Sequence, residues 1–321
     1  MTQRDESFAI MLLMSQIDPG KNELVLPLSF SEWHGLHRSL REQGLGMADL
    51  FDMDMSGLMM RLKMSEQEAY RLCVLLGRVL PLSVSLEGFA MNGIRPVTWN
   101  QREYPRRLKE RLGDKAPPLL YVAGRSELFQ QEAVGIVGAA RKEVDGDLVR
   151  KLTRMLVEKG YTILSDGAPG AGRLAEQEAL KAGGRVIEVA AGGMNRRIGQ
   201  RDMLAMLELN QGVALSLTHP DAPYTASHAR LHNRCLYGLA TAVFVFGAKR
   251  GRSMSCEGAM QALQRGWIDH VYLQDLPGCP DGGEVLLKGA TPLGRLDREI
   301  FENMHGSWRE TMARQTSLFD R

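Results

Sequence analysis

Three apolar runs in the middle of the chain each end in glycines or basic residues. They are residues 134–141 (VGIVGAAR), 163–170 (ILSDGAPG) and 186–193 (VIEVAAGG). Short apolar runs without alternating polar positions are typical of strands buried on both faces of a parallel sheet. Glycines at the strand ends let backbone N–H groups approach phosphates. The sequence therefore predicts an open parallel sheet with a binding site along one edge.

Strand and helix patterns alternate from residue 119 onward. Strands are expected near residues 133–137, 161–164, 186–189, 213–217, 242–246 and 270–273. Helices are expected near residues 147–158, 171–182, 203–210, 230–239 and 256–264. This order requires right-handed crossovers and a sheet covered on both faces. The predicted fold class is α/β, a Rossmann-like, mostly parallel sheet with helices on both faces, preceded by a small all-helical domain.

The first 95 residues have the apolar spacing of short helices. Ser31 is a candidate N-cap, and Ser65 with Glu68 forms a capping-box pattern. Pro81 is expected to end the helix that Ser65 begins, and Asn92-Gly93 to form the next turn. We therefore divide the chain into a helical N-terminal domain (1–95), a linker (96–118), a Rossmann-like domain (119–293) and a C-terminal helix with a tail (294–321).

Composition narrows the class of protein. The 321 residues are 44% hydrophobic and 24% charged, so the chain can bury an ordinary core. The formal net charge of +2 is too small to indicate a nucleic-acid binder by itself. The 4 cysteines form no Cys-x-x-Cys pair, which favours reduced thiols over a disulfide or zinc site. With no apolar run near ~18 residues and no signal-peptide pattern, we expect a cytoplasmic protein. We also expect that the protein binds no metal and no cofactor.

Several segments resemble, in order and spacing, those of one protein family. They are Asn92 to Leu108 with its Tyr-Pro pair, PPLLYVAG at 117–124, VG at 137–138 with Gly146 eight residues after Gly138, SDGAPGAGRLAEQEAL at 165–180, HNRCLYGL at 232–239 and GGEVLLKGA at 282–290. Over residues 65–293 the chain resembles the DprA/Smf family of DNA-processing proteins. The resemblance implies binding of single-stranded DNA in recombination, whether for recombinase loading, DNA uptake, or a mobile-element or defence variant of these tasks. It also implies a homodimer formed through the large domain and delivery of strands to a RecA-type recombinase.

The chain departs from the family pattern at several positions. The arginine of the first glycine loop is replaced by Ala140, with Arg141 one position later. An aspartate and a histidine of the second motif are replaced by Gly172 and Glu176. The family's Tyr-Pro loop is replaced by residues 198–202 (IGQRD). The chain is therefore a divergent relative, whose activity could differ from the family's.

Basic residues concentrate in the loops that follow the predicted strands. In a parallel sheet these loops share one edge, where their cations can line a groove for a phosphate backbone. Placement and resemblance together give the candidate phosphate contacts Gly138, Arg141, Lys142, Ser165, Gly170, Arg173, Arg196, Arg197, Asn233, Arg234, Lys249, Arg250, Arg252, Ser253 and Ser255. The alternative is that scattered lysines and arginines are solvated surface charges. Aromatic residues for base stacking are few, with Tyr224 and Tyr237 the nearby candidates.

The segment after the sixth strand carries a second possible chemistry. Ser253 and Ser255 stand at an expected helix N-terminus, where hydroxyls and free N–H groups form an anion site. Ordinary helix capping by Ser255 is the alternative. Glu257 is a weak candidate for an acid or base in nucleotide cleavage, against the simpler reading of a first-turn glutamate favoured by the helix dipole. With no other catalytic candidate, non-catalytic binding is expected.

The C-terminal tail is a separate signal. Gln315, Leu318 and Phe319 match the Gln-x-x-Leu-Phe peptide that binds the bacterial sliding clamp. A disordered tail offers the Gln315 amide to a polar pocket of the partner, and Leu318 and Phe319 as apolar anchors for a hydrophobic pocket. The alternative is that Leu318 and Phe319 fold back onto the large domain.

Two other functions remain open from the sequence. One is a sensor or hydrolase of a nucleotide-derived ligand that uses the same sheet edge, which Glu257 and the missing family residues favour. The other is a purely structural partner of replication proteins, which rests on the tail alone.

Overall fold

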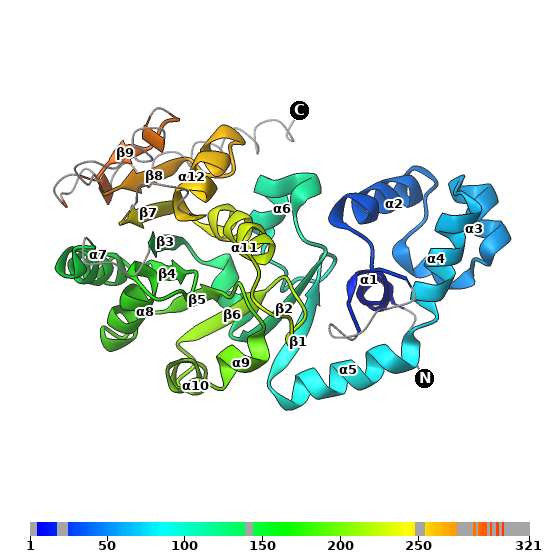
Figure 1. Ribbon diagram of the computed structural model, residues 1–321, viewed down its shortest axis with the longest axis horizontal. Helices are drawn as coiled ribbons and strands as arrows, with labels where there is room; N and C mark the ends of the chain where they lie inside the picture. Colours follow the sequence, from blue (N-terminus) through cyan, green and yellow to red (C-terminus); the bar gives the residue numbers. More distant parts are fainter. Residues whose placement is uncertain are drawn as a thin grey trace.

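The computed structural model describes residues 5–17, 25–138, 144–247, 254–274, 285–286, 288–293, 296, 300–301 and 304. Within these residues, one sheet of nine strands runs through the larger part of the molecule (Figure 1). In sheet order the strands are β1 (Ile94–Thr98), β2 (Leu119–Gly124), β6 (Gly212–Ser216), β5 (Val186–Val189), β4 (Thr162–Ser165), β3 (Ala133–Gly138), β7 (Ala242–Phe246), β8 (His270–Leu273) and β9 (Thr291–Pro292).

Strands β3 to β9 are parallel to one another, whereas β2 is antiparallel to both β1 and β6. The six strands expected from the apolar runs are confirmed as β3 to β8. The sequence pattern does not predict β1, because Pro96 lies in its centre and prolines are depleted from strands. β1 is an edge strand, which is the position where a missing N–H donor is tolerated.

The order of the strands reverses next to β3. From β3 the chain adds β4, β5 and β6 outward in succession, and α11 (Ala226–Leu239) then carries it back to β7 on the other side of β3. In open α/β sheets, ligands bind at the carboxyl ends of the strands where the order reverses. The fold thus marks the carboxyl ends of β3 and β7 as a favoured binding position.

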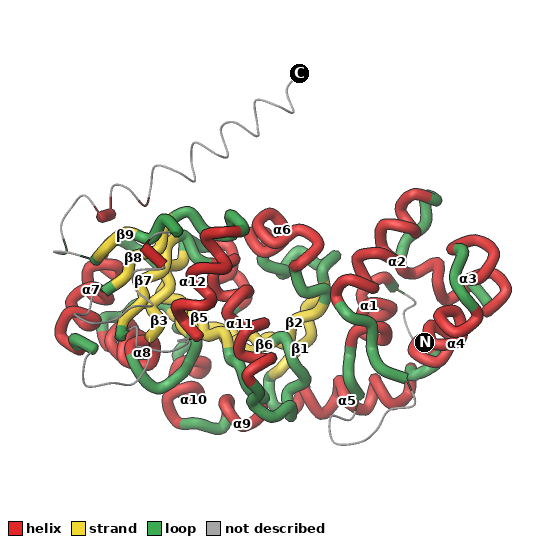
Figure 2. The backbone as a smooth tube through the Cα atoms, turned by 45° about the horizontal axis from the view of Figure 1, so that its top comes forward, coloured by secondary structure: helices red, strands yellow, loops and turns green. Residues whose placement is uncertain are grey.

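Helices cover both faces of the sheet (Figure 2). Ile136 is buried with the helices of one face, and its neighbour Val137 with those of the other. Each central strand therefore needs apolar residues at successive positions, which explains the continuous apolar runs in the sequence. The helices of the Val137 face are α6 (Arg106–Leu112), α11 and α12 (Met254–Gln264), and those of the Ile136 face are α7 (Gly146–Glu158), α8 (Ala171–Lys181), α9 (Met194–Ile198) and α10 (Arg201–Glu208).

The N-terminal helices form a separate unit beside the β1–β2 edge of the sheet (Figure 1). Its core contains the fully buried Trp33, Leu40 and Leu75. Short 3-10 turns lie at Met47–Asp52 in this unit and at Gly113–Lys115 and Ser126–Gln130 near the sheet. The helices of the unit are α1 (Glu6–Met14), α2 (Phe30–Glu42), α3 (Met55–Leu62), α4 (Glu66–Leu76) and α5 (Val79–Met91).

The capping of α2 differs from the expectation, whereas that of α4 agrees with it. Ser29, not Ser31, is the N-cap of α2, so the expected cap at Ser31 is wrong. The Ser29 hydroxyl accepts from the Glu32 N–H at 3.3 Å, and the Glu32 carboxylate accepts from the Ser29 N–H at 2.6 Å. This reciprocal pair needs a glutamate three residues after the cap, and only Ser29 has one. The capping box of Ser65 and Glu68 is confirmed.

Pro81 does not end α4, so that expectation is also wrong. α4 ends at Leu76, and Pro81 lies in the first turn of α5. Proline is tolerated there because first-turn N–H groups have no partner within the helix. The expected turn at Asn92-Gly93 is confirmed, with Gly93 at a φ of 68°.

Polar and aromatic contacts join the helical unit to the sheet unit. His34 Nε2 lies 2.9 Å from the carbonyl oxygen of Ala116 and is buried. The rings of Trp33 and Trp99 are 5.7 Å apart, and Trp99 packs against the cores of both units. The two units therefore share apolar surface rather than being joined only by a connecting segment.

No single helix among the described residues is long and apolar enough to cross a membrane. The pair α4 and α5, bent by 49° at the break between them, passes the test of length and composition together. Leu72 and Leu75 of α4 and Leu82 of α5 are buried in the core of the helical unit, as expected for core helices.

Candidate nucleic-acid interface

The carboxyl ends of β3 and β7 approach each other closely at Gly138. Gly138 pairs with Phe246 in the parallel ladder and has a φ of 150°. A Cβ atom at this position would lie 2.2 Å from the carbonyl oxygen of Phe246, so only glycine fits. The segments 139–143 and 248–253 follow directly on these two strand ends. They contain Arg141, Lys142, Lys249, Arg250, Arg252 and Ser253, which all lie outside the described residues.

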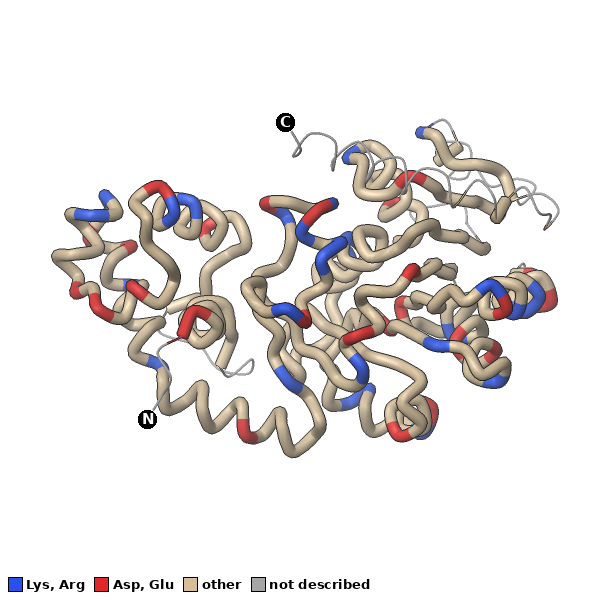
Figure 3. The backbone as a smooth tube through the Cα atoms, turned by 180° about the vertical axis from the view of Figure 1, so that it is seen from behind, with Lys and Arg blue, Asp and Glu red and all other residues tan. Residues whose placement is uncertain are grey.

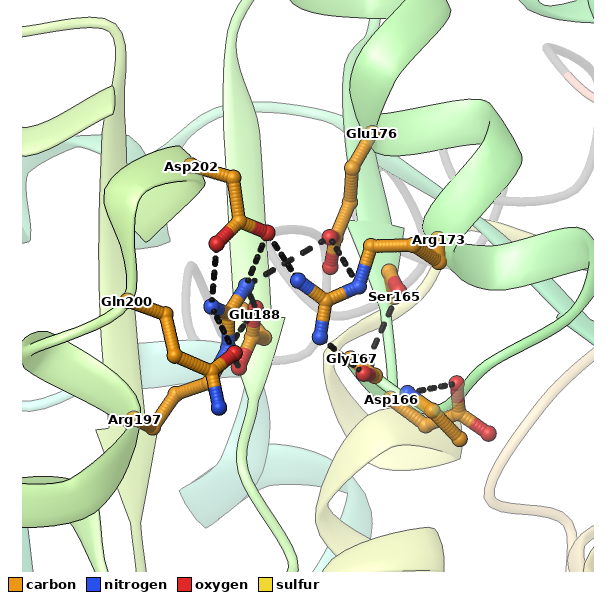
Figure 4. A network of polar contacts seen from close by, with 10 residues as sticks. Ser165, Asp166, Gly167, Arg173, Glu176, Glu188, Arg197, Gln200 and Asp202 are labelled. Atoms are coloured by element: carbon orange, nitrogen blue, oxygen red, sulfur yellow. Dashed lines mark hydrogen bonds and ion pairs between the residues drawn. The ribbon is translucent and has the colours of Figure 1, made fainter. Parts of the chain in front are cut away.

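Arg173 and Arg197 do come together at the ends of β4 and β5, but each is held by carboxylates (Figure 4). Arg197 donates to both oxygens of Glu188, with distances from 2.6 to 3.0 Å, and to Asp202 at 2.9 and 3.1 Å. Arg173 also pairs with Asp202 and donates to the carbonyl oxygen of Gly167 at 2.6 Å. The two predicted phosphate contacts therefore already have anionic partners within the protein.

A third carboxyl group, Glu176 of α8, completes this ion cluster. It lies 3.5 Å from Arg173 and 3.8 Å from Arg197, and it is buried. Burial and the nearby Glu188 raise the pKa of Glu176 well above its usual range, which favours the protonated form. Two arginines then face the two remaining carboxylates, and the cluster has little net charge.

Asp202 remains ionised for a clear physical reason. Although partial burial opposes the charge, the hydrogen bonds from Arg197 lower the pKa of Asp202 to about 2. Although desolvation of its guanidinium opposes the charge, the contacts with Glu188 first, and then with Asp202, raise the pKa of Arg197 above its usual range. The cluster is thus a rigid, paired group and leaves few donors for a phosphate.

Two of the departures from the family pattern, Gly172 and Glu176, lie in this region. An ideal Cβ atom at Gly172 would lie 2.7 Å from a carboxylate oxygen of Asp166 and 2.8 Å from the Ser165 hydroxyl. The absence of a side chain at position 172 therefore leaves the room that Asp166 occupies. Burial raises the pKa of Asp166 to about 6, and its carboxylate accepts from the Ala168 N–H at 3.1 Å.

A cavity of about 450 Å³ opens at the ends of β4 and β5, above the ion cluster. The exposed Arg196 lines it and makes no hydrogen bond or ion pair with any described residue. Tyr224, in the loop between β6 and α11, is 59% exposed and also lines it. The remaining lining residues are Asp166, Gly167, Ala168, Pro169, Arg173, Glu188, Ala190, Ala191, Gly192, Gly193, Arg197 and Gln200.

Asn233 and Arg234 point in different directions from α11. Asn233 donates to the carbonyl oxygen of Met254 at 2.9 Å and so fixes the start of α12 near the carboxyl edge. The Arg234 guanidinium lies 5.4 Å from the centroid of Trp267, in the turn that precedes β8. That turn leads into the amino end of β8, so the structure does not bring Arg234 to the predicted edge.

The remaining predicted residues have mainly structural contacts. The Ser165 hydroxyl accepts from the Gly167 N–H at 3.0 Å, and Gly170 adopts a φ of 139° just before α8. The Ser255 carbonyl accepts from the hydroxyl of Tyr237, which is buried and therefore cannot stack on a base. Glu257 lies 3.4 Å from Arg230, and the two side chains are 42% and 53% exposed. The clamp-motif residues Gln315, Leu318 and Phe319 lie outside the described part of the chain.

Sequence reasoning missed the acidic partners of the arginines. Glu188 lies within an apolar strand and Asp202 opens a helix, so neither carries a motif. The only available signal was a charged residue inside a buried strand, which is rare unless the charge is paired. Figure 3 shows acidic and basic positions interspersed along the described backbone, in keeping with the small net charge.

A comparison with family models places the chain in one family. The family described as DNA recombination-mediator protein A matches residues 95–280, which is more than half of the chain. The DNA processing protein DprA of Bacillus subtilis strain 168 is 30% identical over 185 residues, covering 56% of this chain and 61% of that protein. The chain therefore spans less than two thirds of the length of this relative.

Two solved structures share the fold. The X-ray structure of DNA processing protein A from Streptococcus pneumoniae has a TM-score of 0.61 at 20% identity, covering 84% of this chain and 95% of that one. A structure describing the single-stranded DNA binding mode of DNA processing protein A from Helicobacter pylori has a TM-score of 0.53 at 22% identity, covering 66% and 96%.

Proposed function

The chain belongs to the DNA recombination-mediator protein A family, and from that premise we propose that it binds single-stranded DNA during DNA processing and recombination. The predicted resemblance to the DprA/Smf family is thereby confirmed. The observation that carries the proposal is the reversal of strand order at Gly138 and Phe246, from which two basic segments depart. Cations at such a position can follow a phosphate backbone.

The distribution of free and paired cations favours some contacts over others. Arg173 and Arg197 are neutralised by their carboxylates, and Arg234 lies against Trp267. We therefore assign the main phosphate contacts to segments 139–143 and 248–253, together with the exposed Arg196. Glycines 138 and 170 allow the protein backbone to approach the DNA strand closely. Asn233 holds the start of α12 in place.

The test is the salt dependence of binding to a single-stranded oligonucleotide. Lys249→Ala combined with Arg250→Ala should weaken binding and reduce the slope of log affinity against log salt by about 1.4, because each neutralised phosphate of a single strand contributes roughly 0.7. The matched control is Arg41→Ala with Arg61→Ala, which removes two exposed charges from the helical unit. Equal slopes for the two double variants would remove the basic segments from the interface.

Further partners follow from the family rather than from the structure. We propose that the protein acts in the cytoplasm as a homodimer and delivers the bound strand to a RecA-type recombinase. The comparisons favour a DNA-processing function over a nucleotide sensor or hydrolase. Glu257, the one carboxylate suggested for chemistry, pairs with Arg230, and we assign it no catalytic role.

The C-terminal tail supports a separate proposal, binding of the sliding clamp through Gln315, Leu318 and Phe319. Deletion of residues 315–321 should abolish clamp association and leave the affinity for single-stranded DNA unchanged. A pull-down with purified clamp and an oligonucleotide titration measure the two properties. Retention of the shortened chain by the clamp would refute this part of the proposal.

A further inference from the structure

Helices α11 and α12 lie side by side on one face of the sheet (Figure 1) and are joined by an ion pair. Both run from the carboxyl edge of the sheet to its amino edge, since each connects two parallel strands. Arg230 of α11 lies 3.4 Å from Glu257 of α12. One turn further on, Arg234 follows Arg230 and Gln261 follows Glu257, because residues four apart lie on the same helix face. The second turn of this helix pair therefore has an arginine without the carboxylate that the first turn has.

Arg234 makes no hydrogen bond or ion pair with any described residue, although it is half-buried. Its Nε is buried and has no acceptor. Its guanidinium carbon lies 5.4 Å from the centroid of the Trp267 ring, which holds the group in place. The other described arginines that have no such partner are all exposed, and they are Arg41, Arg61, Arg102, Arg196, Arg201 and Arg265.

A second cation lies at the same ring. Arg265, in the turn after α12, is exposed, and its guanidinium carbon lies 5.7 Å from the centroid of Trp267. Burial first, and then the charge of Arg265, lower the pKa of Arg234. No carboxylate of the described residues pairs with either arginine. An anion placed at both guanidinium groups would relieve their repulsion and receive charge-assisted hydrogen bonds.

Neighbouring carboxylates limit the length of an anion that can bind here. Glu257, which pairs with Arg230, is 42% exposed on one side of the two arginines. Asp269, two residues after Trp267, is 48% exposed and pairs with Arg111 at 3.3 Å. A nucleic-acid backbone needs a row of cations, and these carboxylates would repel its successive phosphates. A short acidic peptide needs only the two free arginines, because a planar carboxylate fits the guanidinium fork.

The position also separates these arginines from the edge assigned to DNA. Trp267 precedes β8 and therefore lies at the amino edge of the sheet, whereas segments 139–143 and 248–253 follow strands at the carboxyl edge. The Trp267 ring is only 5% exposed, so it cannot stack on a nucleobase. A strand that follows the basic segments leaves the two arginines unoccupied.

We propose that Arg234 and Arg265 form a docking site for an acidic segment of a partner protein, whose carboxylates pair with the two guanidinium groups. The inference goes beyond the proposed function and does not depend on it, because the site lies away from the edge assigned to DNA. A chain with both sites can hold a DNA strand and a second protein at the same time.

The test is the binding of a short fluorescein-labelled peptide of alternating aspartate and glutamate, measured by fluorescence anisotropy. A peptide of alternating asparagine and glutamine, with the same label, is the uncharged reference. Arg234→Gln combined with Arg265→Gln should weaken binding of the acidic peptide about tenfold or more, since charge-assisted hydrogen bonds are lost. The matched control is Arg41→Gln with Arg61→Gln, which removes two exposed charges from the helical unit.

A second variant blocks the site while both arginines remain. Gln261→Glu supplies Arg234 with a carboxylate from its own chain, as Glu257 does for Arg230, and should also weaken binding of the acidic peptide. Gln67→Glu is its control, because it adds the same charge at an exposed position of α4. An unlabelled single-stranded oligonucleotide should not displace the peptide.

The outcomes separate a protein partner from nucleic acid. Weaker peptide binding in the double arginine variant and in Gln261→Glu, absent in both controls, supports the docking site whether or not the chain binds single-stranded DNA. Equal binding of the acidic and uncharged peptides, or unchanged binding in the double arginine variant, would refute it. Displacement of the peptide by the oligonucleotide would assign the two arginines to nucleic acid and overturn the proposal.

Discussion

Arg196 and Arg197 are neighbours in the chain with opposite surroundings. Arg196 is exposed and has no partner among the described residues, whereas Arg197 is 12% exposed and pairs with Glu188 and Asp202. From the sequence the two arginines are equivalent candidates for binding phosphate. Their roles differ because the turn of α9 directs one side chain outward and the other toward a buried carboxylate.

Replacement of Arg197 should destabilise the fold, since it leaves Glu188, only 1% exposed, without its partner. We expect Arg197→Met to cost about 3–5 kcal/mol of unfolding free energy. Arg196→Met, one residue earlier, should change it by less than about 0.5 kcal/mol. Urea unfolding followed by far-UV circular dichroism measures both. Similar losses for the two variants would contradict the structural role assigned to Arg197.

Asp166 makes stability depend on pH in a defined direction. Burial raises its pKa to about 6 in the folded protein, above the value of 3.8 that it has when exposed. The folded state therefore binds the proton more tightly, and Asp166 favours folding below about pH 4 and loses that contribution as the pH rises through 6.

Asp166→Asn should therefore raise the unfolding free energy at pH 7.5, by up to about 3 kcal/mol, and have little effect near pH 4. Unfolding in urea at the two pH values provides the measurement. Asp147→Asn is the control, because that side chain is 99% exposed on α7. A gain for Asp166→Asn that is equal at both pH values would show that desolvation of the carboxylate is not its cause.

At the level of elements, the ends of β3 and β7 lie side by side, and the two basic segments follow them in the sequence. The sequence predicts both strands and their order along the chain, but it does not state that they pair. Gly138 and Phe246 pair because α11 returns the chain across β3 after β6. The ladder at Gly138 therefore fixes the relative position of the two strand ends that precede segments 139–143 and 248–253 in the sequence.

Gly138→Ala should disturb this junction, since its Cβ atom would lie 2.2 Å from the Phe246 carbonyl oxygen. We expect a loss of more than about 2 kcal/mol in unfolding free energy and weaker binding of single-stranded DNA. Gly160→Ala serves as the control, because φ is 85° there but nothing lies within 4 Å of the added carbon. It should cost about 1–2 kcal/mol from backbone strain without affecting DNA binding. Equal effects of both variants on binding would argue against the junction.

At the level of the whole molecule, the helical unit and the sheet unit are tied through Trp99 and the His34–Ala116 hydrogen bond. We expect them to unfold together, so that tryptophan fluorescence and far-UV circular dichroism give the same urea midpoint. Trp33 and Trp99 report on the contact between the units, and Trp267 on the sheet. Two separated midpoints would show that the units are independently stable. The proposed division at residues 95 and 118 would then describe folding units.

The sequence by itself determined the α/β class, the six strands β3 to β8 and the family, because buried strands, helix caps and glycine turns are recorded in local periodicity and local motifs. Only the tertiary structure decided which arginines are free. Arg173, Arg197, Glu188 and Asp202 come from four different elements, and their pairing depends on how those elements meet at one edge of the sheet. Local sequence patterns contain no information on such long-range contacts. The sequence therefore predicts which loops are basic, but not which carboxylates pair with their arginines.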